Sequence, residues 1–522
     1  MRLRSPMLQL AAVLWLLAAC GQPASGEQAL RYGLTLVPTG IDPHIHASVE
    51  LGIPLSSVYD TLVFLDPESG DFLPGLAERW EISPDGQRYV FELRQEVTFH
   101  DGTPFNAEAV RANLDYIMDP EHRSQRAQSM LGPLREVRAL DQHAVELILD
   151  APYAPLLDSL SQVYLGMASP WALAQWGPAE YQFHQVGTGP YRFVEYLPAD
   201  HLTLEANPDY AWAPAVYRQR KPQIQTITFR FYEDPATRAL ALESGEVDVI
   251  GELPALEAAR LAQSEEFQIY PVEIPGQPLQ FIFNTQHPPT DDPRVREALV
   301  VGVDRPAIVR TVFGEYSPVA QGPLAAATIG FAPQLAFPEY DPARAEALLE
   351  AAGWVADAQG DRFREGEPLS LLLVAPNWGS NPEVGQLLAA AWEALGAQVE
   401  LEVAPGFGAL NEARQRGEYA AIGMNTFGSD PDLLRPFFAS DGFFNWNAYQ
   451  DVGLDSLLEQ ASRGGSQRSQ LYAEVAAQIR DNWLILPVRD YVNLVGASSR
   501  LEGLRFSAQG WFPYLIELRW RR

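Results

Sequence analysis

The chain has almost no cysteine: Cys20 is the only one among 522 residues. A single cysteine cannot form an intrachain disulfide or a zinc–thiolate cluster. Past the N-terminus the chain also lacks an apolar run of the about 20 residues that a membrane-spanning helix needs. Gly-x-Ser-x-Gly, His-Glu-x-x-His and Walker motifs are missing as well. We therefore do not expect an enzyme, although acidic pairs far apart in sequence leave an exported glycosidase as an alternative.

Positive charge is scarce too, with 37 Lys and Arg residues against 67 Asp and Glu residues and a formal net charge of −30. A surface this acidic repels nucleic acid and anionic lipid headgroups, so we expect no nucleic-acid partner. The chain is nevertheless 47% hydrophobic, which is enough for large buried cores. A chain of this length is expected to form two or three domains.

The N-terminus has the pattern of an export signal. Arg2 and Arg4 precede an apolar run, Met7 to Ala19, that ends in small residues before Cys20. This pattern predicts a lipoprotein-type signal peptide at 1–19 and lipidation of Cys20; the alternative is an ordinary signal with an incidental cysteine. A diacylglyceryl group plus an N-acyl chain on Cys20 gives stable membrane attachment. Removing Arg2 and Arg4 with the signal changes the net charge from −30 to −32.

The stretch from Leu76 to Tyr116 has the clearest local pattern. Apolar and polar residues alternate from Tyr89 to Leu93, which is typical of a half-buried strand. Asp85-Gly86 supplies a tight turn before that strand, and Asn106 is placed to cap a helix after it. The stretch therefore predicts a β-hairpin followed by a helix.

From Leu279 onward, the chain alternates between helical and strand patterns. Four helices are expected to begin at a capping residue and to end near a glycine. Their predicted caps are Asp292, Asp304, Asp341 and Asn381. Helices that alternate with short apolar strands predict an α/β sheet covered by helices.

The motifs of residues 76–110 resemble a known family. They read Leu76-Ala77-x-x-Trp80, Asp85-Gly86, Phe91-x-Leu93-Arg94, Val97-x-Phe99-His100-Asp101-Gly102-x-Pro104-Phe105 and Ala107-x-x-Val110. This long and specific set is similar to the signature of the large extracellular solute-binding proteins of ABC importers (family 5). That family includes oligopeptide, dipeptide, nickel-chelate and some oligosaccharide binders, and the resemblance extends over the mature chain.

The resemblance implies an α/β fold of the two-lobed periplasmic-binding-protein type (type II, large three-domain class) with a central ligand cleft. It divides the chain into a signal peptide (1–19), a tether (20–28), domain I (29–60, 186–276 and 492–522), domain II (61–185) and domain III (277–491). No metal or other cofactor is implied.

The resemblance places ligand contacts in the loop from Gly423 to Asp432, which includes Asn425 and Thr426. In the dipeptide binders this loop carries a carboxylate that anchors the ligand's ammonium group. Phe427 occupies the aligned position here. A gap in the alignment would bring Asp430 into that role, whereas the alternative for Asp430 is the N-cap of a helix that starts at Pro431.

Other expected contacts lie outside this loop. Arg414 matches a ligand-facing arginine of the oligopeptide binders, or else is a surface residue near a helix end. Phe407 falls where those binders have a pocket tryptophan. Trp446 is expected to face the ligand because an indole offers a stacking face and a donor. His44 opens domain I beside the cleft; with His46 it can also chelate a metal, the alternative being a simple turn.

The combined expectation is a lipid-anchored, extracytoplasmic binding protein, monomeric, that captures a peptide-like ligand and delivers it to an ABC permease and its ATPase subunits. A sugar or a nickel chelate is the alternative ligand on the same scaffold. An exported hydrolase, or a sensory or chaperone-like lipoprotein, is the alternative class.

Overall fold

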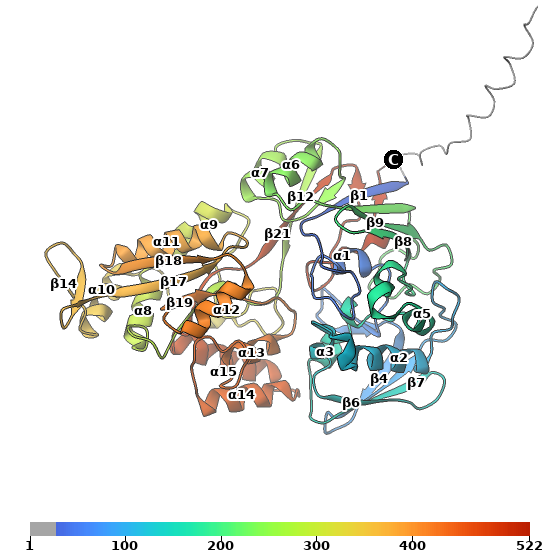
Figure 1. Cartoon of the computed structure of the whole chain (residues 1–522), viewed down its shortest axis with the longest axis horizontal. Helices are drawn as coiled ribbons and strands as arrows, with labels where there is room; N and C mark the ends of the chain where they lie inside the picture. The colour runs from blue at the N-terminus through green and yellow to red at the C-terminus, as the bar shows by residue number, and fades with distance from the viewer. Residues whose placement is uncertain (1–27, 522) are drawn as a thin grey trace, which may run out of the picture.

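The computed structural model describes residues 28–521. The signal peptide expected at 1–19, Cys20 and all but the last residue of the tether at 20–28 lie outside the described residues. Figure 1 shows two lobes side by side, with β12 and β21 between them. The first lobe holds the sheets built from residues 28–273 and 492–521, and the second lobe holds the sheet built from residues 279–489.

A mixed seven-stranded sheet forms one layer of the first lobe. β1 pairs in parallel with β10 and β11, whereas the other neighbours are antiparallel. Across the sheet the strands are β12 (Phe267–Glu273), β21 (Val492–Ser498), β11 (Val249–Ile250), β1 (Ala29–Leu34), β10 (Thr226–Phe231), β9 (His201–Ala206) and β8 (Tyr191–Leu197).

A four-stranded antiparallel sheet contains the predicted hairpin. Its order is β4 (Ala77–Ile82), β5 (Arg88–Leu93), β7 (Ala144–Leu149) and β6 (Leu134–Ala139). The helix that follows the hairpin, α2 (Ala107–Met118), is capped by Asn106, whose side chain accepts a hydrogen bond from the Ala109 N–H. The hairpin and the helix are thus confirmed.

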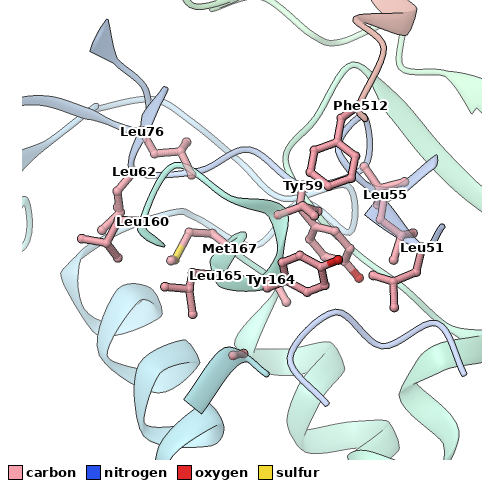
Figure 2. Packing of buried hydrophobic residues seen from close by; sticks show 14 of the residues in the cluster. Leu51, Leu55, Tyr59, Leu62, Leu76, Leu160, Tyr164, Leu165, Met167 and Phe512 are labelled. Atoms are coloured by element: carbon pink, nitrogen blue, oxygen red, sulfur yellow. The ribbon is translucent and has the colours of Figure 1, made fainter. Parts of the chain in front are cut away.

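The remaining elements of the first lobe are short. The helices are α1 (Gly52–Leu55), α3 (Ala127–Met130), α4 (Leu156–Ser159), α5 (Pro170–Glu180), α6 (Pro235–Glu243) and α7 (Ala255–Leu261), and the small strand pairs are β2 (Val63–Leu65) with β3 (Phe72–Pro74) and β22 (Leu501–Glu502) with β23 (Arg519–Trp520). One hydrophobic core joins the early part of the chain to the C-terminal segment. Figure 2 shows part of it, where Phe512 packs near Leu55 and Tyr59.

The second lobe is built on a five-stranded mixed sheet, as the alternating pattern predicts. Its order is β18 (Gln398–Ala404), β17 (Ser370–Pro376), β19 (Ala421–Gly423), β13 (Leu279–Phe283) and β20 (Ile485–Arg489). A small three-stranded sheet holds β14 (Val355–Ala356), β15 (Arg362–Arg364) and β16 (Glu367–Pro368).

The four helices with predicted caps begin close to those residues, and the second lobe contains eight α-helices within residues 28–521. They are α8 (Pro293–Val301), α9 (Arg305–Phe313), α10 (Pro342–Ala351), α11 (Asn381–Glu393), α12 (Phe407–Arg416), α13 (Arg435–Phe438), α14 (Val452–Ser462) and α15 (Arg468–Asp481). Asp292, Asp304 and Asp341 each accept a backbone N–H at the start of their helix. Asn381 does not cap α11, because its buried amide donates instead to the Trp378 carbonyl at 2.8 Å.

Two short crossings join the lobes. One runs from β12 to β13, and the other runs from β20 to β21 through Asp490 and Tyr491. Two lobes joined by two crossings form the periplasmic-binding-protein type of α/β fold that was expected. Across residues 28–521, none of the helices has both the length and the apolar composition to span a bilayer. The exact limits of domains I, II and III stay a prediction.

Candidate ligand-binding site

A cavity of about 160 Å³ lies where the two lobes face each other. The first lobe lines it with side chains from four separate segments, and the second lobe lines it with the loop that follows β19. Its lining residues are Val49, Arg126, Gln162, Tyr164, Gln509, Trp511 and Phe512 on the first side and Asn425, Thr426, Phe427 and Gly428 on the second. Three of the predicted ligand contacts, Asn425, Thr426 and Phe427, are thus brought together here.

The loop after β19 is held by the crossing between β12 and β13. The Gln277 N–H donates to the Thr426 carbonyl at 2.8 Å, and the Gln277 side chain accepts from the Thr426 N–H at 3.1 Å. Gly276 has a φ of +135°, and a Cβ there would lie 2.6 Å from the Phe427 Cα. Only glycine allows this close approach, so the wall of the cavity is fixed directly to a crossing between the lobes.

Arg126 supplies a cation on the opposite wall. It lies just before α3, and its guanidinium carbon sits 4.3 Å from the centre of the Tyr164 ring. Tyr164 is buried, and its hydroxyl donates to the Ser48 carbonyl at 3.0 Å, so the ring is a fixed platform for Arg126. Within residues 28–521, no carboxylate forms a salt bridge with Arg126. The guanidinium of this lining residue therefore keeps its hydrogen-bonding capacity available.

Two residues of the lining also carry hydrogen-bond donors that lack partners among residues 28–521. Asn425 Nδ2 and Trp511 Nε1 are both buried and have no acceptor among the described residues. Among residues 28–521, no aspartate or glutamate lines the cavity. A buried donor without a partner is costly, so a site with two such donors and one cation suits a ligand rich in oxygen acceptors.

Phe427 connects the cavity to the second crossing. Its ring lies edge-on to Tyr491, with centroids 4.7 Å apart, and 5.6 Å from Trp511. Tyr491 belongs to the segment between β20 and β21. A ligand that touches Phe427 therefore contacts a residue packed against both lobes.

Asp430 does not line the cavity; it is engaged inside the second lobe. Its side chain accepts from the Asp432 N–H at 2.8 Å and so caps the short 3₁₀ helix Pro431–Leu434. The same oxygen accepts from Arg468 Nη2 at 2.6 Å. The cap alternative thus describes Asp430 in this structure, because its carboxylate is already satisfied by protein groups.

Trp446 also lies away from the cavity. It is 2% exposed in the core of the second lobe, with ring centroids 6.3 Å from Phe407 and 6.0 Å from Phe444. Phe407 is 48% exposed as the first residue of α12, but it is not among the lining residues. In this arrangement the indole has no face open to a ligand. The reason is packing, since the aromatic run around it fills the lobe interior.

Arg414 and His44 are separate from the cavity as well. Arg414 is part-exposed on α12, and its Nε donates to Asn411 Oδ1 at 3.0 Å. His44 is fully buried, with Nε2 2.8 Å from the Gly166 carbonyl, in agreement with the turn alternative. Within residues 28–521, no group of three or more His, Cys, Asp and Glu side chains is arranged to hold a metal ion.

The sequence did not predict any of the lining residues of the first lobe, among them Arg126, Tyr164 and Trp511. Arg126 stands in an ordinary polar stretch, and no motif marks it. Trp511 belongs to the C-terminal segment, which reaches the cavity only through the fold. The donor character of the site is therefore a product of tertiary structure.

A two-lobed α/β fold with a donor-lined cavity between its lobes defines a class of proteins that bind a ligand between the lobes. Comparison with known proteins agrees. Residues 71–446 match the family described as bacterial extracellular solute-binding proteins, family 5. This match covers more than half of the chain, so the protein belongs to the family 5 extracellular solute-binding proteins.

Individual relatives span nearly the whole chain. The nickel-binding periplasmic protein of Escherichia coli (strain K12) is 27% identical over 484 residues, which are 88% of each chain. Di/tripeptide-binding protein 2 of Pseudomonas aeruginosa (strain UCBPP-PA14) is 27% identical and covers 90% of this chain and 91% of its own. The crystal structure of NikA from Brucella suis in complex with Fe(III)-EDTA matches with a TM-score of 0.82 at 24% identity, covering 94% of this chain and 100% of that one.

Proposed function

We propose that this solute-binding protein captures a short peptide-like ligand between its lobes and delivers it to an ABC permease and its ATPase subunits. The observation that carries the proposal is that three lining residues carry donors without partners among residues 28–521: the Arg126 guanidinium, Asn425 Nδ2 and Trp511 Nε1. A peptide presents backbone carbonyls and a terminal carboxylate, which are the acceptors that these donors lack. A di/tripeptide-binding relative supports the same ligand class.

The charges of the cavity set the ligand's orientation. Arg126 is the charged residue of the lining and pairs best with a carboxylate, because its planar fork binds two oxygens at once. In the part of the chain that the structure describes, no acidic side chain lines the cavity to receive an ammonium group. We therefore infer that the ligand is held through its carboxylate end, in contrast to an anchor through a free amine.

The volume of the cavity limits ligand size. About 160 Å³ is below the roughly 300–1,000 Å³ of sites for drug-sized ligands. A dipeptide or tripeptide therefore suits this cavity better than a long oligopeptide.

A nickel chelate is the second candidate, and the same donors favour it. The described residues offer no metal-ligating cluster, so a metal would have to arrive inside its own chelator. Carboxylates of such a chelator would meet Arg126 as a peptide carboxylate does. A nickel-binding relative supports this alternative.

Thermal unfolding with candidate ligands tests the proposal, because a ligand that binds only the folded state raises the unfolding midpoint. The probes are alanyl-alanine, its N-acetyl form, its C-terminal amide, a nickel–histidine chelate and cellotriose. We expect alanyl-alanine and the N-acetyl form to raise the midpoint and the amide to fail. A midpoint that rises only with cellotriose or only with the chelate would refute the peptide class and assign the sugar or chelate instead.

We also propose that Cys20 carries a lipid anchor that keeps the monomeric protein at the outer face of a membrane. The residues before and at Cys20 support this only through their sequence pattern. Mass spectrometry of the protein purified from a membrane fraction should find a diacylglyceryl group on Cys20. Recovery of a Cys20→Ser variant in the same membrane fraction would contradict the anchor, and light scattering of that variant measures its mass in solution.

A further inference from the structure

The lobes touch at a second place beside the cavity, where a carboxylate of one lobe receives a hydroxyl of the other. Asp158 on α4 of the first lobe is 5% exposed. Its Oδ1 accepts a hydrogen bond from Ser429 Oγ of the second lobe. Its Oδ2 accepts from Gln162 Nε2 at 2.9 Å. Both oxygens are thus satisfied, one within the lobe and one across the boundary.

A backbone contact lies close by. The Ala154 N–H of the first lobe donates to the Ser462 carbonyl at the end of α14, at 2.9 Å. Ser429 itself is 2% exposed, and its carbonyl accepts from the Ile329 N–H at 3.2 Å, so its backbone is held in place by the second lobe. The lobes therefore meet through fixed polar groups.

Several charges face Asp158 from the second lobe. Asp430, next to Ser429, acts on it by repulsion, and Arg468 on α15 acts by attraction. Arg468 is already paired with Asp430 at 2.6 Å. Tyr153 of the first lobe precedes α4. The charges of nearby Asp158, Asp430, Asp432 and Arg435 all act on the pKa of its hydroxyl. When the lobes are together, two carboxylates therefore lie near one guanidinium, which is paired with Asp430 alone.

We propose that Asp158 and Ser429 form a latch that holds the two lobes closed, and that loss of the negative charge on Asp158 tightens this latch. Separation of the lobes returns Asp158 to water and breaks its bond to Ser429. When Asp158 is charged, closure of the lobes is opposed by the burial of that charge and by electrostatic repulsion from Asp430. When Asp158 is neutral, closure of the lobes buries no charge on this residue and is not opposed by repulsion from Asp430.

The direction of the pH effect follows from this geometry. Burial, with repulsion by Asp430 as the next cause, raises the pKa of Asp158 to about 6 in the closed arrangement. In water an aspartate has a pKa near 3.9. A raised pKa in the closed state means that the closed state binds the proton more tightly, so closure strengthens as the pH falls from about 7 to about 4 and levels off below. Within that window, each pH unit changes the ratio of closed to open molecules by up to about tenfold.

Distance measurement without ligand tests the latch. Spin labels are attached to Glu180→Cys on α5 and Glu393→Cys on α11, both exposed and on different lobes, in the mature chain with Cys20→Ser. Double electron–electron resonance then reports the closed and open populations at pH 7.5 and pH 5. We expect the closed population to grow several-fold at pH 5. Because no ligand is added, the outcome is independent of the proposed peptide function.

Two variants separate charge from hydrogen bonding. Asp158→Asn keeps an acceptor for Ser429 without the charge, so its closed population at pH 7.5 should equal or exceed that of the unmodified protein at pH 5 and stay constant with pH. Ser429→Ala removes the donor and should shift the molecules toward the open form at both pH values. This variant also keeps the test valid if Asp158→Asn fails to fold.

Matched controls are Asp150→Asn, an exposed aspartate of the first lobe, and Ser456→Ala, an exposed serine on α14. Neither should alter the populations. A pH response that survives in Asp158→Asn, an unchanged distribution in Ser429→Ala, or an open-only distribution of the unmodified protein at both pH values would overturn the latch.

Discussion

The residues expected at the ligand divide into two groups that differ in how their polar atoms are satisfied. Asn425, Thr426 and Phe427 line the cavity, and the buried amide nitrogen of Asn425 has no acceptor within residues 28–521. Asp430 and Trp446 lie inside the second lobe, where the carboxylate is paired and the indole is covered. From this difference we infer that polar groups without protein partners are the better guide to a ligand site. A charged or aromatic side chain is a poorer guide, because it can be paired or covered inside a lobe.

The largest effect that separates the two groups is expected at Trp446. Trp446→Ala removes a side chain that is 2% exposed, and such a truncation costs about 3–5 kcal/mol of the free energy of unfolding. The fraction that remains folded should bind alanyl-alanine with its original Kd. Urea denaturation and calorimetric titration measure the two quantities. Phe443→Ala, at a side chain 78% exposed, is the control and should change stability by less than about 0.5 kcal/mol.

A loss of affinity in Trp446→Ala with unchanged stability would place the indole at the ligand and reverse the comparison. The sequence does not separate these outcomes, because an apolar ring is buried equally well by a core and by a pocket. Local features are easier to predict. Asp85-Gly86 and Asn106 determine a turn and a cap through their own backbone neighbourhood, so the hairpin and α2 follow from the sequence.

Arg126 shows why the rest of the site was beyond prediction. The chain has 67 acidic residues, and nothing in its order says which arginine will end up without one. The lack of an acidic partner for Arg126 depends on how α3, Tyr164 and the second lobe pack together. The same holds for the buried nitrogen of Trp511, which reaches the cavity from the far end of the chain.

The next largest effect is expected at Arg126. Arg126→Ala should weaken binding of alanyl-alanine by about ten- to a hundredfold, since a hydrogen bond to a charged group contributes roughly 1.5–3 kcal/mol. Arg126→Lys should recover part of this loss, because a lysine keeps the charge but cannot form the two-pronged contact. Calorimetric titration measures each Kd.

The control for Arg126 is Arg135→Ala, an exposed arginine of the same lobe that pairs with Asp150. Its Kd should stay as in the unmodified protein. Equal affinity of Arg126→Ala and Arg135→Ala would show that the cation does not hold the ligand and would remove the carboxylate from the proposed recognition.

A smaller effect is expected when an acid is placed at position 427. Phe427→Asp puts a carboxylate at the wall of a cavity that has none, where the dipeptide binders are expected to have theirs. An added carboxylate should favour a free ammonium group, so the preference for alanyl-alanine over its N-acetyl form should rise a few-fold. Phe427→Asn, with the same lost contact to Tyr491 but no charge, is the control. Identical preferences in the two variants would contradict an orientation set by the charges of the cavity.

The smallest effects are expected at Arg414 and Phe407, both on α12. Neither side chain lines the cavity; Arg414 bonds to Asn411 of its own helix, and Phe407 lies half-exposed over Trp446. Arg414→Ala and Phe407→Ala should therefore change the Kd for alanyl-alanine by less than about twofold and stability by about 0.5 kcal/mol or less. A tenfold loss of affinity in either variant would mean that α12 reaches the ligand after all. It would extend the binding surface beyond the described cavity, because a longer ligand could then contact both α12 and the loop after β19.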